Sequence, residues 1–82
     1  MSLPTMHLEA VLFSAAKPIS IDMLEEVFGL STEETQKYIE ELQRELKEQN
    51  RGIRLRISGA GVELVSAVEC ADYVGHISKL SL

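Results

Sequence analysis

The sequence is poor in the residues from which chemical sites are usually built. Among its 82 residues Cys70 is the single cysteine, and the two histidines, His7 and His76, lie far apart. One cysteine cannot form an internal disulfide framework or a metal site based on cysteine pairs. The histidines have no ligand spacing, and no nucleophile arrangement or pair of acid–base carboxylates is visible. We therefore expect no catalytic residue, no metal, no cofactor and no enzymatic activity.

Long hydrophobic runs are missing as well. The longest uncharged stretches, such as residues 10–16, are far shorter than the roughly 18 residues that indicate a membrane span. No basic segment followed by an apolar leader opens the chain. Together with the single cysteine, these absences favour a soluble protein of the reducing cytoplasm. Residues 1–3 could be an expression remnant, and we give them no functional weight.

Basic residues are in short supply, with 8 Lys and Arg against 13 Asp and Glu and a net charge of −5. The charge is −3 over residues 1–30, −3 over 31–50, +2 over 51–66 and −1 over 67–82, counted from the printed sequence. The charge is positive in residues 51–66 because this segment contains three arginines, Arg51, Arg54 and Arg56, and a single acidic residue, Glu63. Only this third segment could attract an anion.

What the chain does have is a folded protein's composition, with 45% hydrophobic and 26% charged residues. Residues 5–16 show helical spacing, and Pro18 ends the segment because it disfavours helix at Lys17. Both faces of this helix are apolar, which predicts burial on more than one side. A second helix is predicted over residues 22–28, capped by Ser20 and closed by Gly29. Its apolar residues, all expected to face inward, are Met23, Leu24, Val27 and Phe28.

A third helix is predicted from Ser31, because Ser31 and Glu34 have the spacing of a capping box. Its apolar stripe consists of Tyr38, Ile39, Leu42 and Leu46. The two-residue junction before it is typical of a helix-turn-helix. This helix stands where such proteins read DNA, yet its net charge of −3 over residues 31–50 is repelled by phosphates. Its glutamates either form a solvated face or contact a basic protein partner, and both alternatives argue against base readout.

After Gly52 the period changes to alternation, which predicts a half-buried strand with Ile53, Leu55 and Ile57 on one face. Residues 59–61 form a turn, since they lack the Lys-Ser/Thr and helix of a phosphate loop, and residues 62–66 return as the partner strand. A final amphipathic segment, 69–80, packs back or reaches out. The predicted fold is therefore α+β: a winged helix-turn-helix with three helices, a two-stranded β-hairpin wing and a C-terminal helix, in one domain over residues 6–80.

Two groups of residues are candidate contact sites. An exposed apolar patch would mark a protein interface; the alternative is that the first helix is sandwiched between the second and the C-terminal helices. The candidates are Met6, Ala10, Phe13, Tyr73 and Ile77. The wing carries three candidates for weak phosphate contacts, namely Arg51, Arg54 and Arg56. The alternative is that these arginines only form a solvated face of the strand.

Several stretches together resemble the segregation and condensation protein B family. They are residues 8–13 (LEAVLF), 17–20 (KPIS), 29–31 (GLS), 51–53 (RGI) and 62–66 (VELVS). Their order and spacing cover most of residues 6–80. The chain departs from the family pattern at Ala16, where glycine is frequent, at Val62, where tyrosine is frequent, and at Ala67-Val68, which replaces a basic-proline pair.

The resemblance implies a non-enzymatic subunit of the bacterial SMC-kleisin complex, which acts in chromosome condensation and segregation. Such a protein would form a homodimer and bind the kleisin subunit, segregation and condensation protein A, and through it the SMC ATPase. It would be cytoplasmic and associated with the nucleoid. It would not bind a membrane, and its direct binding to nucleic acid would be absent or weak. Family members resemble two tandem winged helices, so we expect this chain to be the N-terminal half, with the second domain absent. The rival interpretation is a winged-helix DNA-binding transcriptional regulator.

Overall fold

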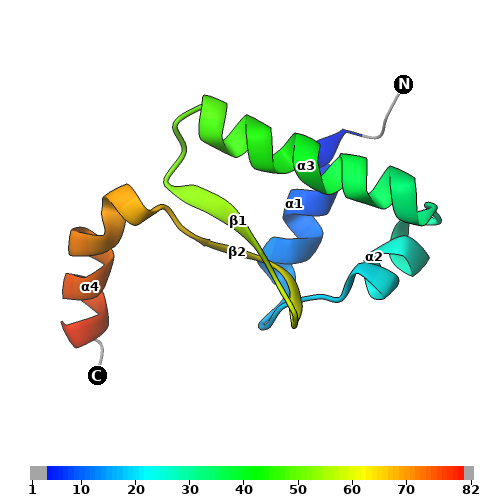
Figure 1. The fold of residues 1–82 in the computed structure, drawn as a ribbon. Coiled ribbons are helices and arrows are strands. Elements are labelled where there is room, and N and C mark those ends of the chain that lie inside the picture. Colours follow the sequence, from blue (N-terminus) through cyan, green and yellow to red (C-terminus); the bar gives the residue numbers. More distant parts are fainter. Residues whose placement is uncertain (1–3, 81–82) are drawn as a thin grey trace.

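The computed structural model describes residues 4–80. Its elements are α1 (Thr5–Ser14), α2 (Ile21–Phe28), α3 (Thr32–Glu48), β1 (Ile53–Ser58), β2 (Gly61–Ser66), the 3-10 turn η1 (Val68–Cys70) and α4 (Ala71–Leu80). Helices α1 and α3 lie against the β1–β2 hairpin, α2 packs against α3, and α4 projects from the far end of the hairpin (Figure 1). This arrangement confirms the predicted α+β winged helix. The suggested expression remnant, residues 1–3, lies outside the described residues.

The predicted helix ends of the helix-turn-helix are all present. The Ser20 side chain accepts a hydrogen bond from the Met23 amide at 3.2 Å, and Gly29 closes α2 with a left-handed φ of 64°. At the start of α3, the Ser31 amide donates to the Glu34 carboxylate at 3.0 Å, and the Glu34 amide donates to the Ser31 hydroxyl at 3.2 Å. The bond from the Ser31 backbone favours the charged carboxylate, so the pKa of Glu34 is lowered.

The core lies between α1, α2, α3 and the inner face of the hairpin. The apolar stripe predicted for α3 is buried throughout, which confirms that part of the pattern. The buried core residues are Leu8, Leu12, Leu24, Tyr38, Ile39, Leu42, Leu46, Leu55 and Val62. Phe28 packs edge-on against the Tyr38 ring, with 5.4 Å between the ring centroids.

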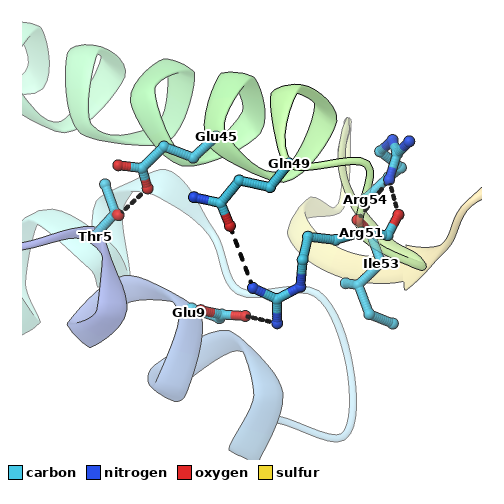
Figure 2. Close-up of polar contacts among 7 residues, drawn as sticks. All are labelled: Thr5, Glu9, Glu45, Gln49, Arg51, Ile53 and Arg54. Atoms are coloured by element: carbon cyan, nitrogen blue, oxygen red, sulfur yellow. Dashed lines mark hydrogen bonds and ion pairs between the residues drawn. The ribbon is translucent and has the colours of Figure 1, made fainter.

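The start of α1 is anchored to α3 by two polar contacts. The Tyr38 hydroxyl donates to the Pro4 carbonyl at 2.7 Å, and the Thr5 hydroxyl donates to the Glu45 carboxylate (Figure 2). Burial raises the pKa of Tyr38, since the neutral phenol is favoured in this setting. These contacts hold α1 with one face on the core and leave its opposite face turned to solvent.

A short β-bridge attaches the wing to the segment between α1 and α2. The amides of Ile19 and Val62 each donate to the other residue's carbonyl, at 2.9 and 2.8 Å. Gly61 permits this approach: a Cβ there would lie 2.3 Å from the Ile19 carbonyl oxygen, and the residue has a φ of +131°. Only glycine fits this position without moving backbone.

Some sequence-based expectations about burial are wrong. Met23 and Val27 are 49% and 53% exposed, because in the eight-residue α2 only Leu24 is fully buried, with Phe28 packed against the core. Ile53 and Ile57 share the face of Leu55 but are 40% and 48% exposed, since only the centre of β1 lies over the small core. The predicted end of the first helix is also wrong: α1 ends at Ser14 rather than at residue 16, because the backbone of Ala15 is already extended.

Candidate protein-interaction site

An open groove of about 550 Å³ follows the solvent face of α1. Three of the predicted interface residues meet here: Ala10 is exposed, and Met6 and Phe13 are 65% and 82% exposed. We call this surface the α1 groove; its lining is Met6, Glu9, Ala10, Leu12, Phe13, Ala15, Arg51, Ile53 and Leu64. In the described part of the chain this face of α1 is exposed and the groove has no lining residue from α2 or α4, so the alternative of a sandwich between those two helices does not apply.

One edge of the α1 groove carries a charged pair that the sequence pattern did not reveal. The Arg51 guanidinium lies 4.0 Å from the Glu9 carboxylate and donates to the Gln49 side chain at 3.4 Å. Figure 2 shows Arg51 between these two side chains, which come from α1 and from the end of α3. Glu9 was one of the few polar groups on an otherwise apolar helix, and that isolation was the available signal.

The three arginines predicted to contact phosphate each face a glutamate. The Arg54 guanidinium lies 3.6 Å from the Glu69 carboxylate and donates to the carbonyls of Arg51 and Ile53. Arg56 is paired with Glu63 directly across the hairpin. Exposed ion pairs contribute only about 0–1 kcal/mol, so these arginines could exchange partners. The neighbouring carboxylates nevertheless cancel much of their positive field, and weak phosphate contact stays a prediction.

The other two predicted interface residues lie on α4, away from the α1 groove (Figure 1). Tyr73 is 78% exposed and Ile77 is 62% exposed, while Val68 in the preceding turn is 84% exposed. Residues 73 and 77 are one helical turn apart and so share a face. We call Tyr73, Val74 and Ile77 the α4 face. The predicted patch is therefore two separate apolar surfaces within one chain.

The outer side of α3 offers little to nucleic acid. Among its exposed residues are Glu33, Glu34, Glu40 and Glu48, and the described structure places Lys37, Arg44 and Lys47 among them. Phosphate attraction supplies nearly all non-specific DNA affinity. An acidic helix in the reading position therefore opposes DNA binding.

Within residues 4–80, no three His, Cys, Asp or Glu side chains come together in a way that could hold a metal ion. None of the helices in this part of the chain is long and apolar enough to cross a membrane.

The fold and these surfaces define a winged-helix domain with an acidic third helix and two exposed apolar surfaces. A family model described as segregation and condensation complex subunit ScpB matches residues 6–81, and the chain belongs to this family. The segregation and condensation protein B of Carboxydothermus hydrogenoformans is 33% identical over 72 residues, which are 88% of this chain and 39% of that protein. The chain thus spans about two fifths of this curated relative.

Solved structures of the family have the same fold. A dimer of the ScpB N-terminal domain complexed with ScpA peptide matches with a TM-score of 0.81 and 31% identity, covering 89% of this chain and 91% of that one. ScpB from Mycobacterium tuberculosis matches with a TM-score of 0.84 over 99% of this chain and 53% of that one. Its identity of 21% supports the fold alone.

Proposed function

We propose that the protein is a subunit of the SMC-kleisin complex in chromosome condensation and segregation, acting through homodimerisation and binding to the kleisin subunit. The observation that carries this proposal is the match, over nearly the whole of both chains, to an ScpB N-terminal domain that is a dimer with an ScpA peptide. The exposed apolar residues of α1 and α4 supply the kind of surface that such contacts require.

We also propose that this chain forms the first of two winged-helix domains. Its span of 39% of a curated relative and 91% of a solved N-terminal domain supports that division. The proposed role is one of binding rather than catalysis, exerted on the SMC ATPase through the kleisin. The complex acts on the bacterial chromosome, so the proposed location is the cytoplasm, at the nucleoid.

Two measurements test this function. Sedimentation equilibrium over a concentration series is expected to show a reversible dimer of the 9.1 kDa chain. Fluorescence anisotropy is then expected to show saturable binding to a labelled peptide from the central part of the cognate kleisin, and a scrambled peptide is the control. A strict monomer at high micromolar concentration would contradict self-association, and equal binding of both peptides would contradict kleisin recognition.

The rival interpretation, a DNA-binding transcriptional regulator, receives no support from the matched relatives. The acidic α3 and the glutamates beside the wing arginines also oppose it. An electrophoretic mobility shift at low salt separates the two functions, because tight, sequence-selective binding would favour the regulator.

A further inference from the structure

Helix α4 is exposed over residues 71–77, the part of it whose side chains the structure describes. Isolated helices shorter than about 12–15 residues are marginal in water, and α4 has 10 residues. Gly75 lies at its middle, and glycine is less favourable than alanine inside a helix. Among the described elements, α4 packs mainly against the η1 turn that precedes it. A helix of this kind needs a further packing surface.

The connection before α4 directs it away from the α1 groove of its own chain. The Ala67 amide donates to the Gly52 carbonyl at 2.8 Å, and the Cys70 amide donates to the Ala67 carbonyl at 2.9 Å. Ala67 is only 2% exposed. The first bond ties the start of the turn to the residue before β1, the second closes the turn on itself, and α4 leaves the turn away from α1 (Figure 1). For α4 to reach its own groove, this turn would have to open.

One chain therefore presents the α1 groove and the α4 face, which do not meet each other. We propose that they meet between two copies: α4 of one chain packs in the α1 groove of the second, and the second chain returns the same contact. This inference rests on the homodimer proposed above and assigns its geometry. A two-fold dimer requires that a surface of one copy fit a surface of the other reciprocally, and this pairing meets that requirement.

The available apolar area suits such a dimer. Phe13 in the groove is 82% exposed and Tyr73 on α4 is 78% exposed. An aromatic side chain buries roughly 150–250 Å², so the two copies of both rings could bury roughly 500–800 Å². Stable interfaces bury about 1,200–2,000 Å² in total. The remaining area is within reach of Met6, Val68 and Ile53, which are all exposed.

Cross-linking between chains of different mass tests this geometry. In a Cys70→Ser background, a tagged chain carries Ala10→Cys in the groove and an untagged chain carries His76→Cys, an exposed position one turn from Tyr73 on α4. After mixing, a bis-maleimide is expected to join tagged to untagged chain in high yield. Glu33→Cys, at the exposed start of α3, replaces Ala10→Cys as the matched control and is expected to give little product.

Sedimentation of two charged variants supplies the second readout. Phe13→Glu and Tyr73→Glu each place a charge in the proposed contact, and each is expected to raise the dimer Kd roughly tenfold or more, equivalent to about 1.4 kcal/mol. Val27→Glu changes a residue that is 53% exposed on α2 and is expected to leave the Kd unchanged. Thermal melts followed by circular dichroism verify that all three variants fold.

The outcomes separate this geometry from dimerisation itself. The exchange of α4 would be overturned, with the homodimer left intact, by the following result: the unsubstituted protein dimerises, both charged variants have the same Kd as it does, and the cysteine pair gives no inter-chain product. A product within one chain carrying both cysteines, without inter-chain product, would show that α4 folds back and would also overturn it. An unsubstituted protein that stays monomeric would overturn the homodimer and this contact together.

Discussion

Replacing Gly61 by alanine should separate the wing from the segment between α1 and α2. A Cβ at this position would lie 2.3 Å from the Ile19 carbonyl oxygen and 2.6 Å from its carbon. Both atoms belong to backbone, so no side-chain rotation relieves the clash. The Ile19 and Val62 backbones must move apart, and the two hydrogen bonds between them lengthen or break.

The expected loss of stability follows from these terms. Two backbone hydrogen bonds contribute about 0.5–1.5 kcal/mol each. A non-glycine residue held at a φ of +131° adds strain of about 1 kcal/mol or more. The total is about 3 kcal/mol, a large share of the stability of so small a domain. For a chain of this size it corresponds to a fall in Tm of at least about 10 °C.

Gly59→Ala is the matched control, since it makes the same chemical change two residues earlier in the same hairpin. A Cβ at Gly59 would meet nothing within 4 Å. Its effect is expected to lie within about 1 kcal/mol of zero and to favour stability, because alanine restricts the unfolded chain. Urea unfolding followed by circular dichroism measures both variants. Equal stabilities for the two would refute the argument from the Ile19 contact.

Three further changes test other contacts. Tyr38→Phe removes the bond to the Pro4 carbonyl and should cost about 1 kcal/mol. Since burial raises the pKa of Tyr38, the native protein binds more protons than the unfolded chain above about pH 10. The stability of the native protein should therefore fall as the pH rises through that region, and Tyr38→Phe should lack this fall. Chemical denaturation over a pH series measures both proteins. Identical pH profiles would contradict the raised pKa of Tyr38. Ser31→Ala removes the acceptor for the Glu34 amide and should cost about 1 kcal/mol of stability. Thermal melts measure this loss, with Thr32→Ala at the next, exposed position as control. A loss no greater than that of the control would argue against the cap. Arg56→Gln should reduce the salt slope of any low-salt DNA binding by about 0.9 in mobility-shift titrations; an unchanged slope would mean that the wing does not touch phosphate.

The helical part of the fold was predictable because its signals are local. Ser20, Gly29 and Ser31 each mark a helix end through bonds within a few residues, and such bonds depend on nothing distant in the chain. The buried stripe of α3 follows from its spacing alone. The hairpin followed from alternation on either side of a glycine-rich turn, and its register pairs Leu55 with Leu64.

Burial at the margins of the core was not predictable in the same way. Periodicity indicates which residues share a face but not how far the opposing surface extends. Ile57 has the same pattern as Leu55, yet it is 48% exposed because it lies towards the hairpin tip. Met23 likewise fits an inward pattern on a helix of only eight residues, and its exposure depends on how α2 lies against α3.

The candidate site, like the core, could be predicted from the sequence only in part. By its own order of apolar, acidic and glycine residues, the sequence determined a winged helix, the negative charge of its third helix and the amphipathic character of residues 69–80. Only the tertiary structure decided that Met6, Ala10 and Phe13 form a groove beside the Glu9–Arg51 pair, and that Tyr73 lies on a helix turned away from it (Figure 1). The reason is physical: helix and strand patterns arise from neighbours a few residues apart. The contact between Glu9 on α1 and Arg51 after α3 depends instead on interactions between residues far apart in the sequence. The same is true of the direction in which α4 leaves the hairpin.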